Sequence, residues 1–142
     1  MSQALALAAE AQAAGEVPVG AVIVLKGEVV AAARNSSIAQ NDPTAHAELL
    51  AIRQACGRVS NYRLEGAILY STLEPCVMCA GALVAARVST LVFAARDLRF
   101  GGVRSKFRLA DSDLLNHRLE IVEGVLAADS ARLLQNFFAE RR

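Results

Sequence analysis

Runs of apolar residues separated by turn residues divide the chain into a regular succession of short elements. Residues 19–25 and 28–33 are mostly apolar and flank Lys26-Gly27, a pair typical of a tight hairpin turn. Apolar runs of strand length recur later, over 67–73, 90–94 and 119–122. Helices are expected over 2–14, from 41–44 to about 56, from 75 to about 87 and over 129–140, with a short helical turn near 111–115.

The order of these elements predicts how the strands are connected. The strand over 67–73, the helix that begins at Pro75 and the strand over 90–94 follow one another directly, which is typical of parallel strands joined by a crossover helix. The hairpin adds antiparallel strands to the same sheet. We therefore expect an α/β fold in one domain over residues 1–142, with a central mixed five-stranded sheet and helices on both faces.

Composition narrows the class of protein. The 142 residues are 54% hydrophobic, yet no apolar run approaches the roughly 20 residues that cross a membrane. The first seven residues carry no basic charge, which argues against a secretory signal. Three cysteines, two of them in one Cys-x-x-Cys, do not make a disulfide framework. These features favour a cytoplasmic protein without a membrane segment, and a net charge of +1 does not by itself indicate nucleic-acid binding.

Two short motifs carry the candidate chemistry. His46-Ala47-Glu48 offers an imidazole and a carboxylate, and Pro75-Cys76-Val77-Met78-Cys79 offers two thiols. One histidine and two cysteines supply three ligands to a zinc ion and leave the fourth position to water, as catalytic rather than structural sites do. The paired motifs match the known signature of zinc-dependent nucleobase deaminases, in which the glutamate is not a ligand.

The spacing of these residues explains why they suit such a site. With Pro75 at the first helical position, Cys76 and Cys79 share one face of the first turn and lean toward the helix N-terminus. The positive end of the helix dipole there lowers thiol pKa values. We expect His46 to bind the same ion from the start of the preceding helix, and Glu48 to exchange protons with the water and the substrate.

Other interpretations of the same residues stay open at this point. A Cys-x-x-Cys pair can be a redox couple, and a structural zinc site would need a fourth protein ligand, for which Cys56 and His117 are the spare candidates. Cys56 lies ten residues beyond His46, roughly 15 Å along one helix, and is by default a packing residue.

Beyond the zinc motif, nearly the whole chain resembles the bacterial tRNA-specific adenosine deaminases, which convert the wobble adenosine to inosine. The motifs that favour this family over free-base deaminases are Asn-Tyr-Arg-Leu, Leu-Asn-His-Arg and the terminal Phe-Phe with two arginines. The blocks that carry the resemblance are residues 16–22, 42–48, 61–64, 73–82, 95–97, 115–118, 137–138 and 141–142.

The resemblance implies a three-layer α/β/α cytidine deaminase-like fold, one zinc ion per subunit, a homodimer and a tRNA anticodon stem-loop as substrate. It also implies roles for further residues. Asn35 falls where the family binds the flipped base, and Asp97 where it meets the ribose. Phe138, Arg141 and Arg142 fall on the terminal helix that touches the anticodon loop.

These assignments have competitors in the sequence. Asn35 could be an ordinary turn residue, and Asp97 could pair with Arg96 or cap a loop. Residues 96–108 hold five basic side chains against one acid, which suits phosphate contacts but also a solvated loop. Arg104 stands where many relatives have glycine, and the N-terminus is shorter than in many of them. A small-molecule deaminase of guanine, cytosine or a nucleoside, and a non-catalytic zinc protein that binds RNA or a partner, are the alternative functions.

Overall fold

The secondary structure follows the predicted order, with helices and strands built around one mixed sheet. The structure is a computed structural model that describes all residues, 1–142. In chain order the elements are α1 (Ser2–Ala13), β1 (Gly20–Leu25), β2 (Glu28–Arg34), α2 (Ser37–Gln40), α3 (Ala47–Val59), β3 (Ile68–Leu73), α4 (Val77–Ala85), β4 (Thr90–Ala95), β5 (Glu120–Glu123) and α5 (Ala127–Ala139).

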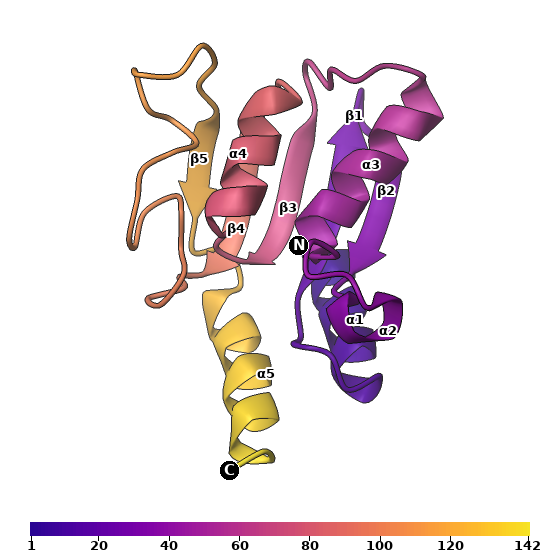
Figure 1. Cartoon of the computed structure of the whole chain (residues 1–142), viewed down its shortest axis with the longest axis vertical. Helices are drawn as coiled ribbons and strands as arrows, with labels where there is room; N and C mark the ends of the chain where they lie inside the picture. The colour runs from indigo at the N-terminus through magenta and orange to yellow at the C-terminus, as the bar shows by residue number, and fades with distance from the viewer.

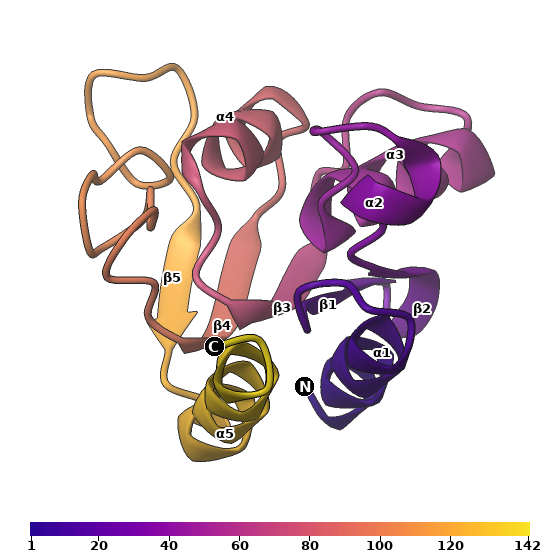
Figure 2. The ribbon, with the colours of Figure 1, turned by 60° about the horizontal axis from the view of Figure 1, so that its bottom comes forward.

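The five strands form one sheet in the order β2-β1-β3-β4-β5. Strand β1 is antiparallel to both β2 and β3, whereas β3, β4 and β5 are parallel. Helices α3 and α4 cover one face, and α1 and α5 cover the other, so the molecule has three layers (Figures 1 and 2). The predicted α/β fold with a mixed five-stranded sheet is confirmed. None of the helices has the length and apolarity needed to cross a membrane.

The alanine content of the N-terminal helix has a packing reason. Ala4, Ala8 and Ala11 are fully buried and lie on the face of α1 that meets the sheet. The approach is so close that a Cβ on Gly20 would lie 2.0 Å from the carbonyl oxygen of Ala4. Small side chains on the helix and a glycine on the strand therefore let the backbones of α1 and β1 touch.

The topology brings the functional loops to one edge of the sheet. Because β2 runs in the same direction as β3 and β4, the carboxyl ends of these three strands lie along a common edge. Asn35 follows β2, Cys76 follows β3 and Asp97 follows β4. Helices α3 and α4 both begin near this edge (Figure 1), where ligand sites of open α/β sheets are usually found.

Outside the paired motifs, the prediction was wrong in detail at three places. The helix expected from residues 41–44 begins at Ala47, because Asp42 Oδ1 instead accepts hydrogen bonds from the N–H and Oγ of Thr44 in a turn. Ahead of that turn stands a short helix over Ser37–Gln40 that the pattern did not reveal. Residues 111–115 form turns with no helical segment.

Candidate active site

The N-termini of α3 and α4 present the four residues of the paired motifs. His46 is the N-cap of α3, and Glu48 is the second residue of that helix. Cys76 is the N-cap of α4, and Cys79 lies in its first turn. Pro75 therefore precedes the N-cap instead of occupying the first helical position. An N-cap residue has extended backbone angles, which swing the side chains of His46 and Cys76 outward from the helix ends.

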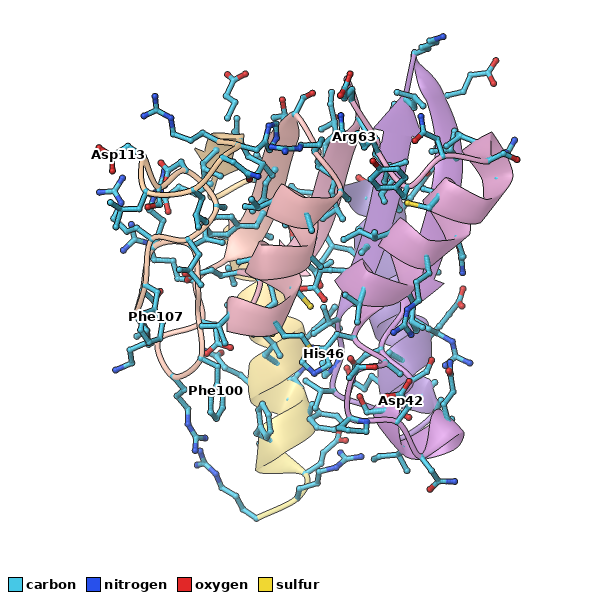
Figure 3. The ribbon with its side chains drawn as sticks, turned by 45° about the horizontal axis from the view of Figure 1, so that its top comes forward. Asp42, His46, Arg63, Phe100, Phe107 and Asp113 are labelled. Carbon is cyan, nitrogen blue, oxygen red and sulfur yellow. The ribbon has the colours of Figure 1, made fainter.

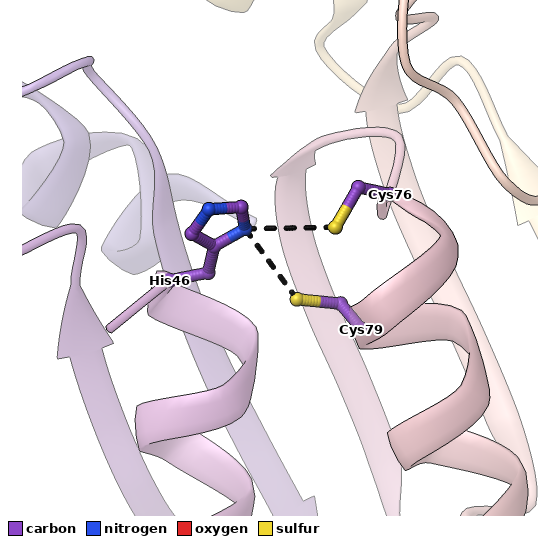
Figure 4. A group of neighbouring side chains, drawn as sticks. All are labelled: His46, Cys76 and Cys79. Atoms are coloured by element: carbon purple, nitrogen blue, oxygen red, sulfur yellow. Dashed lines mark hydrogen bonds between the residues drawn. The ribbon is translucent and has the colours of Figure 1, made fainter. Parts of the chain in front are cut away.

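The three predicted ligands have the geometry of a metal site. His46 Nδ1 lies 3.6 Å from Cys76 Sγ and 3.7 Å from Cys79 Sγ (Figure 4). Nitrogen and sulfur ligands of one tetrahedral zinc ion, at about 2.1 and 2.3 Å from the metal, lie about 3.6 Å apart. All three ligand atoms lie within 4.8 Å of one another. The donor set and its spacing therefore fit one zinc ion.

The thiol pKa values of the two cysteines are shifted in opposite directions. A hydrogen bond from Cys79, and a second from His46, lower the pKa of Cys76 to about 4. The hydrogen bond between the two cysteines, together with burial, raises the pKa of Cys79. The hydrogen bond between His46 and Cys76 raises the pKa of His46. A metal cation would displace the remaining thiol proton, because thiolates are the form that binds metals. A lowered pKa alone would also suit a redox pair, but a redox pair does not need an imidazole nitrogen within 3.7 Å of both sulfurs.

Glu48 lies beside the three ligands and outside their set. Its side chain is only 4% exposed, and burial raises the pKa of the carboxyl above its ordinary value. Ser71 Oγ donates to Glu48 Oε1 at 3.3 Å, and Cys79 Sγ lies 3.8 Å from Oε2. A buried carboxyl with a raised pKa, next to a metal site, is suited to accept a proton and release it again.

Neither spare residue supplies a fourth protein ligand. Cys56 lies near the far end of α3 and is half-buried against the hydrophobic core. His117 hydrogen-bonds through Nε2 with the carbonyl oxygen of Val88 at 2.7 Å. Only His46, Cys76 and Cys79 come together, so the fourth position of a bound metal is left for water or substrate.

Asn35 and Asp97 occupy the same sheet edge but differ in what they do there. Asn35 is buried, and its backbone N–H donates to the carbonyl of Val19. Asp97 Oδ1 accepts from the N–H groups of Arg99 and Phe100, so Asp97 caps the loop that follows β4. It does not pair with Arg96. Capping uses Oδ1 and leaves Oδ2 without a hydrogen-bond donor from the protein.

Phe138 lies on α5, and Arg141 and Arg142 lie just beyond the C-terminal end of that helix. Phe137 is 3% exposed and packs in the core, whereas Phe138 is 45% exposed and meets it edge to face. Arg141 stacks on the Phe137 ring and donates to the carbonyl of Gly15, so it helps to dock α5 beside α1. Arg142 is exposed. Helix α5 projects beyond the sheet edge where α3 and α4 begin (Figure 1).

The basic segment is less free than its composition suggests. We call residues 97–108 the β4 loop. Arg96, just before it, forms a two-bonded ion pair with Glu123, and Arg104 forms another with Asp111. Arg108 also approaches Asp111, at 3.6 Å. Arg99 and Lys106 are the basic side chains of the segment without a carboxylate partner.

The sequence reasoning missed one buried acid at the site, Glu74. Although burial raises its pKa, hydrogen bonds from Ser105, Arg104 and Asp97 outweigh that effect and hold the pKa below its ordinary value. Its position between a buried strand and the Pro-Cys-x-x-Cys motif was visible in the sequence. Its partners lie 23–31 residues further on, in a loop whose path the sequence does not reveal.

Fold and ligand geometry together define a deaminase, and the whole chain, residues 1–142, matches the MafB19-like deaminase family. A tRNA-specific adenosine deaminase of Haemophilus influenzae is 47% identical over 100% of this chain and 83% of its own length. A solved structure from studies of A-to-I editing by tRNA:A34 deaminases superposes with a TM-score of 0.91 at 42% identity, covering 94% of this chain and 97% of that one. The chain belongs to the tRNA-specific adenosine deaminase family, as its motifs predicted.

A guanine deaminase from Bacillus subtilis is also similar, at a greater distance. It is 35% identical, with a TM-score of 0.67, over 99% of this chain and 90% of that one. The lower similarity places the free-base enzyme further from this chain than the tRNA-specific deaminases.

Proposed function

We propose that this protein is a zinc-dependent hydrolase that deaminates the wobble adenosine of a tRNA anticodon loop to inosine. The observation that carries the proposal is the cluster of His46, Cys76 and Cys79 with Glu48 beside it, at the start of two helices. Family membership supports the tRNA substrate, because the tRNA-specific deaminases are more similar than the guanine deaminase.

Three residues would hold the zinc ion, and a fourth would move protons. His46 Nδ1 and the sulfurs of Cys76 and Cys79 are the ligands. When bound, zinc lowers the pKa of a water molecule and so supplies a nucleophile near neutral pH. Glu48 would accept a proton from the attacking water, whose oxygen would bond to C6 of adenine, and would pass that proton to the adjacent ring nitrogen. It would then carry the second water proton to the amino group, and the C6–N bond would break to release ammonia.

The remaining site residues would hold the substrate. Asn35 would hydrogen-bond the flipped base, since it is buried at the edge where α3 and α4 begin. Asp97 would bind the ribose with the oxygen that its loop cap leaves free. Phe138 on α5 and Arg142 just beyond it would contact the anticodon stem-loop. Arg141 is mainly a docking residue in this proposal, because its guanidinium is already engaged.

The proposal includes a homodimer and a reducing compartment. Leu98 and Phe100 are large exposed side chains in the segment after β4 that a second subunit could cover. The three cysteines are free, which suits a cytoplasmic enzyme whose thiols must stay available to zinc.

A direct assay of product and substrate class tests the function. We expect the zinc-loaded protein to form inosine in an anticodon stem-loop RNA with adenosine at the wobble position, and not in the same RNA with that adenosine moved into the stem. Ammonia release from guanine, cytosine and adenosine is measured in parallel. Ammonia from a free base with unchanged RNA would replace the tRNA proposal by the small-molecule alternative.

The ion pairs of the basic segment predict which basic residues contact phosphate. Replacing Arg99 and Lys106 together by glutamine should weaken stem-loop binding and reduce the slope of log affinity against log salt by about 1.4, since a single-stranded phosphate contact contributes roughly 0.7. Arg96→Gln removes a similar charge that is already paired with Glu123. Binding in a salt titration should change little in that control, and an equal loss in both proteins would contradict the assignment.

A further inference from the structure

The side chain of Glu74 is the most heavily hydrogen-bonded carboxylate in the molecule. It lies in the turn between β3 and α4, two residues before Cys76, and is 1% exposed. All of its donors come from the β4 loop. Oε1 accepts from the N–H groups of Val103 (3.2 Å), Arg104 (2.6 Å) and Ser105 (2.8 Å), and Oε2 accepts from the N–H of Asp97 (3.0 Å) and the hydroxyl of Ser105.

No cationic side chain forms an ion pair with Glu74. The guanidinium groups of Arg96 and Arg104 are paired with Glu123 and Asp111. A buried carboxylate is costly unless its oxygens are hydrogen-bonded, so the negative charge of Glu74 depends on the loop amides. Because the same hydrogen bonds hold the loop, the path of the loop in turn depends on the carboxylate.

The loop is also in direct backbone contact with the metal-ligand segment. The backbones of Gly101 and Cys76 form an isolated antiparallel β-bridge, and the N–H of Gly102 donates to the carbonyl of Pro75 at 2.8 Å. A Cβ on Gly101 would lie 2.4 Å from the Glu74 carboxyl carbon, and one on Gly102 would lie 2.8 Å from the backbone nitrogen of Val77. Side chains are therefore excluded at both positions, and the loop is set against Cys76 without any gap.

We propose that Glu74 is a positioning residue that fixes the β4 loop against the start of α4 and so places the substrate-facing side chains of that loop. This inference rests on the proposed function. Asp97, at one end of the bonded segment, holds the oxygen assigned to the ribose, and Arg99 and Lys106 are the unpaired cations. Phe100 and His46 lie toward the same end of α4 (Figure 3). Glu74 is not a metal ligand, because its carboxylate is saturated by loop donors.

The Glu74→Gln variant tests this placement, because it keeps the size of the side chain and replaces one acceptor oxygen by a donor. The new NH₂ group must face N–H or O–H donors, so the loop is expected to detach. Hydrogen exchange at Asp97, Val103, Arg104 and Ser105 should become about tenfold faster or more. The KM for the stem-loop RNA should rise about tenfold or more, kcat should stay within about threefold, and stoichiometric zinc should remain.

Two further variants complete the test, one as a control for stability and one as a milder change to the same contact. Ile23→Val removes one buried methyl group from the core and so lowers stability without touching the loop. It should leave both the exchange rates of the four amides and the KM unchanged. Ser105→Ala removes only the hydroxyl donor and should give a smaller effect in the same direction, which decides the question if Glu74→Gln does not fold.

The outcomes separate this inference from the proposed function. Unchanged exchange at the four amides, unchanged KM, or loss of zinc in Glu74→Gln would each overturn the positioning role. Hydrogen exchange needs no substrate, so a wild-type protein that does not act on RNA would overturn the tRNA substrate while the exchange result still decides whether Glu74 holds the loop.

Discussion

Glu48→Gln is expected to lose deaminase activity by about a thousandfold in kcat, while the protein keeps its fold and its zinc. The glutamine amide has the shape of the carboxyl and can still accept the hydrogen bond from Ser71. In the wild-type protein this bond joins Ser71 Oγ to Glu48 Oε1 at 3.3 Å. It cannot take up a proton from water and release it to the base, and proton transfer of this kind contributes roughly 10²- to 10⁴-fold to rates. Zinc is retained because Glu48 lies outside the ligand set.

Single-turnover rates of inosine formation and the zinc content of the same preparation measure the two expectations together. Glu28→Gln, an equivalent change on the exposed hairpin, should behave as wild type. A rate near wild type in Glu48→Gln would remove Glu48 from the mechanism. If wild type and variant were equally inactive yet both bound RNA, the non-catalytic zinc protein would be the better description.

Most of the strands were predictable because they are largely apolar segments bounded by turn residues. In the hairpin, Lys26 and Gly27 both have positive φ, the geometry that their place between two such runs indicates. Helix α3 was predicted too early because Asn41–Thr44 carry the residue types of a helix start. Those residue types are equally suited to a turn, and the choice between the two depends on packing that the local sequence does not contain.

That the three candidate metal ligands come together was predictable for a different reason from the loop contacts. His46, Cys76 and Cys79 are chemically specialised, and two of them lie three residues apart. The bonds of Glu74 and the Arg104–Asp111 ion pair join ordinary residues across a loop with no periodic pattern. Their partners become evident only when the loop path is known. Composition showed that residues 96–108 are rich in basic side chains, but it could not show which of them pair with nearby carboxylates.

Replacing a metal ligand should have the largest effect on the protein as a whole. Cys76→Ala or His46→Ala leaves two ligands of the three, and we expect loss of stoichiometric zinc and of detectable inosine formation. Since the zinc site exists only in the folded state, the free energy of zinc binding adds to folding stability. At a free zinc concentration of about 1,000 Kd this amounts to about 4 kcal/mol, or roughly 10 °C in Tm for a chain of this size.

Cys56→Ala is the matched control for the ligand variants, because it removes a third cysteine that packs against the core away from the cluster. Its zinc content should equal that of wild type. Metal analysis and thermal unfolding, with and without a chelator, check these expectations: the chelator should lower the Tm of wild type and Cys56→Ala, but not that of Cys76→Ala. Stoichiometric zinc in Cys76→Ala would refute the ligand assignment. Zinc loss in Cys56→Ala would instead show that this cysteine belongs to the site, which would make the site structural.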